Sequence, residues 1–286
     1  MREGGRISNV LYQRDSFDAE QTPGTHVKGG SMSKQLLAAV ALAAAGAGAH
    51  ASTLLAAWDT NGPIREYTTG GAFIQTWGTV NNNATGPASD EFGNVYGTNP
   101  SFGNNVIEKN SPANVSLGTF TTTLDGNWVE DATYLGGGYL ALSTFEGNVF
   151  KVDQTGAYSL LFSTGESFIG VTYDGANLWT TSGFFGANTI YKRDFAGTVL
   201  ASFTVGFAPG GIGYDASDGT LYIGDLNGNI HHVSTGGSLL GAFNAGTSNA
   251  IDGLEVKAAV PEPATFALML AGLAAVGALA RGRKQG

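Results

Sequence analysis

The chain has 286 residues and contains no cysteine. This absence excludes disulfide bonds, thiolate metal sites and a cysteine nucleophile. Stability must therefore come from side-chain packing and from backbone pairing.

Charged residues are scarce as well, at 13% of the chain, and basic residues are the scarcest of them. Between Ser52 and Val260 there are 18 Asp plus Glu against 6 Lys plus Arg. Because so acidic a surface repels phosphate backbones, we expect no nucleic-acid partner.

Groups that could carry catalysis are few. The only histidines between Ser52 and Val260 are His231 and His232, which are adjacent on an expected strand and therefore point to opposite faces, so they cannot ligate one metal ion. His231 with Asp225 and Ser234 lacks the Gly-x-Ser-x-Gly turn that exposes a serine nucleophile. The stretch "GDLNGN" from Gly224 resembles calcium loops only in composition, and a hairpin turn explains it more simply. We predict no cofactor and no metal site, with a weak Ca²⁺ site as the alternative.

Glycine, in contrast, is abundant, with 44 residues, and a pattern of about 40 residues recurs five times. Its copies begin 42, 43, 41 and 40 residues apart: "IREYTTGGAFIQTW" from Ile64, "VIEKNSPANVSLGTF" from Val106, "VFKVDQTGAYSLLF" from Val149, "IYKRDFAGTVLASF" from Ile190 and "IHHVSTGGSLLGAF" from Ile230. Each copy is typical of two strands joined by a tight turn, and a second hairpin precedes four of the five copies. Four short antiparallel strands per 40 residues predict the blade of a β-propeller.

The two ends of the repeat region complement each other. The first copy is preceded by one strand, "LLAAWDT", and the strand that it lacks follows the last copy as "AIDGLEV", from Ala250 to Val256. One composite blade made from both ends would leave no sheet edge at the seam. We therefore predict an all-β fold, a five-bladed propeller of four-stranded antiparallel blades over residues 52–257, rather than a β-sandwich or β-solenoid. Recurring aromatic residues are expected in the cores between blades: Tyr134, Tyr173, Tyr214, Phe120, Phe162, Phe203 and Phe243.

The segment "MSKQLLAAVALAAAGAGAHAS" from Met32 has a charged start, a short apolar run and the small residues Ala49 and Ala51 around His50. These features predict a secretory signal peptide over residues 32–51, because a buried N-terminal helix would have a polar face. A signal peptide preceded by 31 mostly polar residues would be an unusual substrate for export. We interpret them as a non-native extension, since Lys28-Gly29-Gly30 can be encoded by a purine-rich ribosome-binding sequence ahead of Met32.

Residues 258–286 contain Pro261, Glu262 and Pro263, then an uncharged run of 17 residues from Ala264 to Ala280. That run would form a helix of about 26 Å, slightly short of a hydrocarbon core of about 30 Å, and it can span a membrane. The basic tail follows at once, and by the positive-inside rule it stays cytoplasmic while the body lies outside. It contains Arg281, Arg283 and Lys284.

This order of "VPEP", apolar helix and basic cluster, behind an N-terminal signal peptide, resembles the PEP-CTERM sorting signal of Gram-negative bacteria. The resemblance covers Val260 to Lys284 and implies an exosortase, a membrane-embedded cysteine transpeptidase-like enzyme, as the partner that processes the tail. It also implies a transient anchor in the inner membrane, then delivery to the cell surface or to the matrix of a biofilm. An ordinary C-terminal membrane anchor is the alternative.

The first residues of the innermost strands would line the central channel of the propeller. They are Pro87, Glu130, Asp131, Gly170, Gly211 and Asp252. The starts "APGGIGYD" and "SFIGVTYD" resemble those of NHL-type and lyase-like propellers, a likeness of fold only.

The acids Glu130, Asp131 and Asp252 are the candidate ligand site, for a cation or a sugar hydroxyl, and solvated loop acids are the alternative. Few titratable groups could converge on one site, so we expect a non-catalytic binding or scaffolding protein associated with exopolysaccharide. The alternative is a secreted polysaccharide lyase or hydrolase that uses the channel acids.

Overall fold

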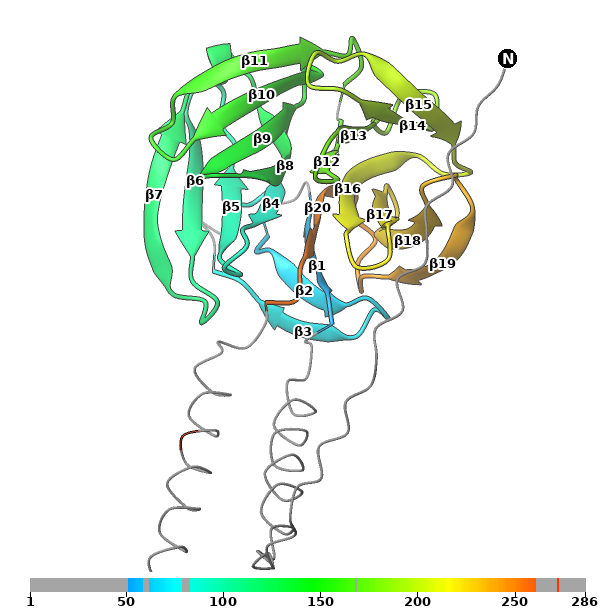
Figure 1. Ribbon diagram of the computed structural model, residues 1–286, viewed down its shortest axis with the longest axis horizontal. Coiled ribbons are helices and arrows are strands. Elements are labelled where there is room, and N and C mark those ends of the chain that lie inside the picture. Colours follow the sequence, from blue (N-terminus) through cyan, green and yellow to red (C-terminus); the bar gives the residue numbers. More distant parts are fainter. Residues whose placement is uncertain (1–50, 59–61, 79–82, 168, 261–271, 273–286) are drawn as a thin grey trace, which may run out of the picture. The chain divides into compact units, whose positions relative to one another are not determined.

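The computed structural model describes residues 51–58, 62–78, 83–167, 169–260 and 272. In these residues, 20 strands form five sheets of four strands, and the strands of each sheet are antiparallel. Figure 1 shows the five sheets arranged around a centre, with β4, β8, β12, β16 and β20 innermost. The prediction of an all-β, five-bladed propeller is confirmed. A single turn of 3-10 helix, η2 (Leu124–Gly126), lies between two blades.

Each blade is one sheet, and its strands follow one another from the axis of the ring outward. Blade 1 contains β20 (Ile251–Lys257), β1 (Thr53–Trp58), β2 (Arg65–Thr68) and β3 (Phe73–Thr76). Blade 2 contains β4 (Gly86–Ser89), β5 (Val95–Asn99), β6 (Asn105–Asn110) and β7 (Ser116–Thr122). Blade 3 contains β8 (Val129–Gly136), β9 (Tyr139–Thr144), β10 (Asn148–Asp153) and β11 (Tyr158–Ser163). Blade 4 contains β12 (Val171–Tyr173), β13 (Leu178–Thr181), β14 (Thr189–Arg193) and β15 (Val199–Thr204). Blade 5 contains β16 (Pro209–Asp215), β17 (Thr220–Asp225), β18 (Asn229–Ser234) and β19 (Leu239–Asn244).

Blade 1 closes the ring by joining the two ends of the repeat region. β20 pairs with β1 from Thr53 opposite Lys257 to Trp58 opposite Ile251, with one bulge. The composite blade expected from the complementary chain ends is therefore present. It leaves no unpaired edge at the seam of the ring.

The hydrophobic core is divided into five clusters, and each cluster lies between two neighbouring blades. Tyr134, Tyr173 and Tyr214 pack against three of them, and the outer-strand phenylalanines contribute to four, as the sequence predicted. Because every cluster needs two blades, no blade can bury its apolar faces alone.

Turn glycines bring neighbouring blades together. Gly197, in the outer hairpin of blade 4, has φ of 85°, and a Cβ there would come within 2.7 Å of the Phe162 side chain in blade 3. The same close contact joins Gly237 to Phe203. A residue with a side chain would be strained at these positions and would separate the blades.

The outermost strands, β3, β7, β11, β15 and β19, contain no charged residue and carry exposed aliphatic side chains. Charged side chains usually protect such edges from pairing with another chain. Here each outermost strand has a β-bulge where it pairs with its neighbour. A bulge bends and twists the strand, so it supplies the protection that charge does not.

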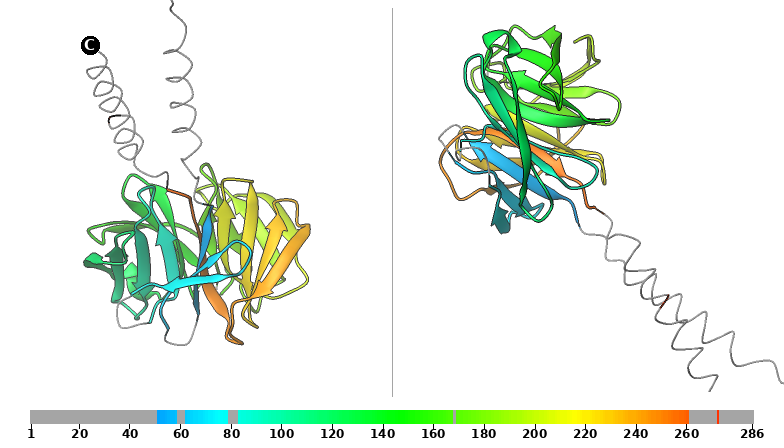
Figure 2. Two further views of the ribbon diagram at one scale, coloured as in Figure 1. Left: turned by 90° about the horizontal axis from the view of Figure 1, so that it is seen from below. Right: turned by 90° about the vertical axis from the view of Figure 1, so that its left-hand side faces the viewer.

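The propeller has two distinct faces, and its strands run from one to the other (Figure 2). The termini face carries the start of β1, the end of β20 and the hairpins 90–94, 137–138, 174–177 and 216–219. The distal face carries the loops that join the second and third strands of blades 2 to 5, residues 100–104, 145–147, 182–188 and 226–228. Antiparallel connections require that these two sets of turns lie at opposite ends of the strands.

Candidate functional site

The innermost strands meet at the axis of the ring through one equivalent residue from each blade. Four of these residues are glycines and the fifth is an aspartate: Gly86, Asp131, Gly170, Gly211 and Gly253. A Cβ on Gly211 would come within 2.5 Å of the Leu254 nitrogen, and one on Gly253 within 1.9 Å of the Thr85 oxygen. Backbones so close leave no room for side chains from four of the five blades. Among the residues that the structure describes, only Asp131 places a side chain at this level of the axis.

The carboxylate of Asp131 joins four blades. Oδ1 accepts the N–H groups of Ala132 at 2.8 Å and Leu254 at 3.2 Å. Oδ2 accepts those of Val171 at 3.2 Å and Ile212 at 3.1 Å. The residue is fully buried. Each donor follows the axial residue of its own strand, so a single side chain satisfies the equivalent N–H group in blades 1, 3, 4 and 5.

Proline accounts for the fifth blade. Pro87 follows Gly86 on β4, at the position that corresponds to the donor residue of each of the other four blades. A proline nitrogen carries no hydrogen, so blade 2 has no N–H group to donate there. Its Cδ lies against Gly253, where the other blades present an N–H group. A carboxylate can accept about four hydrogen bonds, and here it meets four donors and one proline.

Burial raises the pKa of Asp131 well above its ordinary value, and the nearby carboxyl of Glu255 adds to the rise, while the backbone N–H groups oppose it in part. The arrangement fits an ionised carboxylate, since both oxygens face donors only. Glu255 has fewer hydrogen-bond donors around it than Asp131. Burial raises its pKa well above the ordinary value, and its neighbours are the Thr133 hydroxyl and the Ser89 N–H. Its Oε2 has no hydrogen-bond partner among the described residues.

The three candidate channel acids therefore do not share one role. Glu130 and Asp252 are buried beside the axis, while all the accepting capacity of Asp131 is used by backbone donors. Among the described residues, no group of three or more His, Asp or Glu side chains is close enough to hold a metal ion. The sequence indicated the position of Asp131 but not its structural role.

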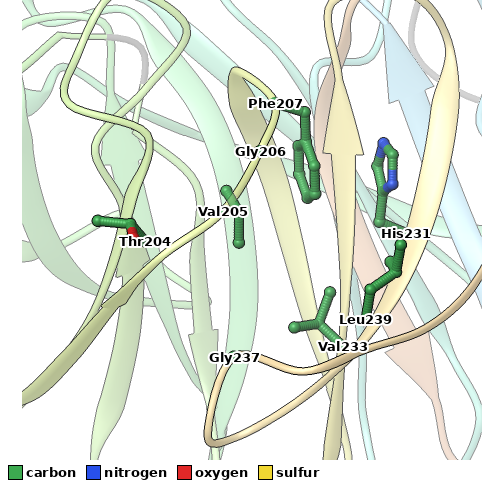
Figure 3. A pocket seen from close by; sticks show the side chains of 8 residues that line it. All are labelled: Thr204, Val205, Gly206, Phe207, His231, Val233, Gly237 and Leu239. Atoms are coloured by element: carbon green, nitrogen blue, oxygen red, sulfur yellow. The ribbon is translucent and has the colours of Figure 1, made fainter.

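A cavity of about 320 Å³ lies between blades 4 and 5 (Figure 3). In it the rings of Phe207 and His231 stack with centroids 3.7 Å apart, and His231 Nε2 lies 2.9 Å from Asp225 Oδ2. His231 is the one titratable side chain of the eight lining residues, and its Nδ1 is buried. This arrangement packs two blades together, and Asp225, which does not line the cavity, is the titratable partner of His231.

The oxygens of Asp225, in the loop considered for calcium, are used within its hairpin. They accept the N–H groups of Asn227 and Asn229 and the amide of the Asn229 side chain, besides the contact with His231. Those bonds hold the pKa of Asp225 below its ordinary value despite partial burial. His232 lies among other neighbours, stacked on Tyr222, so the two histidines do point apart as expected.

The distal face carries a feature that sequence reasoning missed. Each of its four described loops projects an apolar side chain, between 38% and 77% exposed, and we call this set the apolar rim: Phe102, Phe145, Phe185 and Leu226. Trp128 adjoins it, with its ring 5.0 Å from that of Phe102. In each loop the apolar residue stands one or two positions before a glycine, a signal that could have been read from the repeat alignment. Single exposed apolar side chains are ordinary, but several on one face make that face a candidate for an interaction surface.

The expected sorting residues Pro261, Glu262, Pro263, Arg281, Arg283 and Lys284 lie outside the described residues, as do residues 1–50, which include most of the expected leader. No helix in the part of the chain that the structure describes has the length and hydrophobicity to cross a membrane.

Residues 259–284 match the family model of the PEP-CTERM protein-sorting motif. That motif implies processing by an exosortase, export, and a cell-surface or extracellular destination. No curated protein is significantly similar to the chain.

Among solved structures, a chain of the crystal structure of a nidogen/laminin complex is 16% identical, with a TM-score of 0.53, and the match covers 73% of this chain and 99% of that one. A protein of unknown function from Bacteroides caccae is 11% identical, with a TM-score of 0.45, covering 68% of this chain and 74% of that one. The first likeness agrees with the propeller fold and shows nothing about binding.

Proposed function

We propose that this protein is a non-catalytic binding module, carried to the outer surface or the biofilm matrix of a Gram-negative bacterium, which holds extracellular polysaccharide on its distal face. The sorting motif at residues 259–284 is the observation that supports the extracellular destination. Before processing, the segment from Ala264 to Ala280 anchors the chain in the inner membrane, and an exosortase then acts near Pro261 to Pro263.

The apolar rim supports the choice of ligand. Aromatic side chains present a negative π face that packs well against the polarised C–H groups of a sugar ring. The described body begins and ends on the termini face, so the apolar rim lies on the face opposite to both ends of the body. The acidic body repels anionic polymers, which favours a neutral or amine-bearing polysaccharide.

The axis supports a binding role rather than a hydrolase or lyase. Asp131 has no accepting capacity left for a substrate, and tight glycine contacts close the channel at its level. An enzyme of this fold would need acids that reach a substrate from an open cleft.

Replacing three rim aromatics, Phe102→Ala, Phe145→Ala and Phe185→Ala, is expected to weaken binding to a neutral polysaccharide such as dextran. If each stacking contact contributes about 0.5–1.5 kcal/mol, the loss is roughly tenfold or more. Because these side chains are between 38% and 77% exposed, Tm should change much less than on truncation of a core residue. Affinity electrophoresis in dextran, in alginate as an anionic probe, and in the producing cells' own polysaccharide measures the effect.

Phe92→Ala is the matched control, because Phe92 is as exposed as the rim residues but belongs to a hairpin of the termini face. It should leave the mobility unchanged. Equal weakening by both variants would contradict a site on the distal face. Retardation of the unmodified protein by alginate alone, or by none of the three polymers, would contradict the ligand class.

A further inference from the structure

A second cavity, of about 360 Å³, lies on the termini face, where the described body begins and ends. It is bounded by blades 1 and 5, the two blades at the seam of the ring, and its lining includes both the start and the end of the described body. The lining residues are Ala51, Ser52, Thr69, Asp215, Ser217, Asp218, Tyr222 and Ala259.

This cavity is acidic, and none of its eight described lining residues is basic. Two of the eight residues are carboxylates, Asp215 and Asp218, and Asp215 is nearly fully buried. His232 lies beside the lining, where it is hydrogen-bonded to Thr220 at 2.8 Å and is 3.9 Å from Asp218, whereas Lys257 is paired with Glu66 at 2.8 Å. Tyr222 completes the titratable groups facing the cavity. Before leader cleavage, therefore, the buried Asp215 faces no lysine or arginine in this lining.

Ser52 is seated against that carboxylate. The residue is 9% exposed, and its Oγ donates to Asp215 Oδ1 at 3.2 Å. The Ser52 nitrogen lies within about 7 Å of the same oxygen, because the N and Oγ of one serine are joined through only two carbons. The contact crosses the seam, since Ser52 precedes β1 in blade 1 and Asp215 ends β16 in blade 5.

The expected leader ends at Ala51, so its removal changes the charge of this group. Hydrolysis of the Ala51–Ser52 peptide bond by a signal peptidase consumes one water, leaves a carboxylate on Ala51 and an amine on Ser52, and the amine takes up a proton at neutral pH. An uncharged amide beside Asp215 thus becomes an ammonium ion.

We propose that Asp215 is the binding site for the α-ammonium group of the mature N-terminus, and that this ion pair ties blade 1 to blade 5 only after the leader has been removed. The acidic cavity provides the charge complementarity, and the Ser52 hydroxyl already shows the chain end in place. Maturation then strengthens the ring at its seam. The proposal rests on cleavage after Ala51 and is independent of the polysaccharide ligand.

The pairing carries a defined pH dependence. An unpaired α-amino group has a pKa of about 7.7–8.0, and a neighbouring carboxylate raises it in the folded state. A raised pKa of a base means that the added stability is fully present below about pH 7.7 and is lost as the pH rises through the folded-state value.

The test compares two chains that both end at Gly286, one beginning at Ser52 and one at Ala49, in detergent solution between pH 6 and pH 10. At pH 6.5 the chain that begins at Ser52 should melt about 2–4 °C higher. This difference in Tm should disappear by about pH 10. When both chains carry Asp215→Asn, it should be absent at every pH. Asp153→Asn is the control, because Asp153 lies in a hairpin of blade 3, away from the seam. When both chains carry it, the difference in Tm should persist.

Equal melting of the two chains at pH 6.5, or a difference that survives in Asp215→Asn, would overturn the proposal. An exported protein whose mass shows a first residue other than Ser52 would remove its premise. Dextran binding should be the same for both chains, so failure here is distinguishable from failure of the proposed function.

Discussion

Asp131→Asn should destabilise the propeller by about 3–5 kcal/mol, because the substitution leaves buried donors unsatisfied. The asparagine oxygen can still accept two of the four N–H groups, but its NH₂ group would face the other two. For a domain of about 200 residues this corresponds to a fall in Tm of roughly 10 °C, measured by calorimetry or circular dichroism.

Glu255→Gln is the matched control, since Glu255 is a second buried carboxyl close to Asp131. Its pKa is raised in the folded state, so its contribution to stability is present below about pH 4.3 and is lost as the pH rises through the folded pKa. The neutral glutamine should therefore raise Tm at pH 7, and the gain should shrink toward pH 4. If both substitutions changed Tm alike, the special role of the Asp131 hydrogen bonds would be contradicted.

A chain that ends at Ala250 should lose its cooperative fold, because it lacks β20. The truncation exposes β1 and removes Ile251, Leu254 and Val256 from the cluster between blades 5 and 1. Burial of three such side chains contributes about 1.5–3 kcal/mol each, a sum comparable with the whole stability of a typical domain. Thermal unfolding and amide exchange measure the result.

A chain that ends at Lys257 supplies the control, and it should melt like the longer protein. A permuted chain that carries residues 250–257 ahead of Thr53 should also regain stability, because Lys257 and Thr53 are directly paired and a short turn can join them. A drop of only a few degrees for the chain that ends at Ala250 would argue against ring closure through blade 1.

The architecture could be predicted from the sequence because the information for each blade is local. Alternating strands and turn glycines recur about every 40 residues, and the unmatched strand at Ala250–Val256 indicated the closure. The tyrosines and phenylalanines between blades were predictable for the same reason, since their spacing follows the repeat.

The role of Asp131 could not be predicted, because it depends on partners 40, 81 and 123 residues away. Without the ring, an acid at the start of an inner strand resembles a ligand for a cation or a sugar. The neighbouring residues can be interpreted only once the ring is known. The absence of side chains lets the backbones approach the carboxylate at the glycines 86, 170, 211 and 253, and the proline at 87 removes the fifth N–H donor. The apolar rim was also missed, because single exposed phenylalanines in loops carry no signal until the loops are known to share a face.

The central claim, a propeller sorted to the outside by its C-terminal motif, is tested most directly by the intact mass and location of the protein in its own host, with and without the exosortase. The account predicts a species that begins near Ser52 and ends near Val260, found at the surface or in the matrix only when the exosortase is present. A full-length tail retained in the inner membrane in both strains would contradict it, and would make the protein an anchored propeller instead.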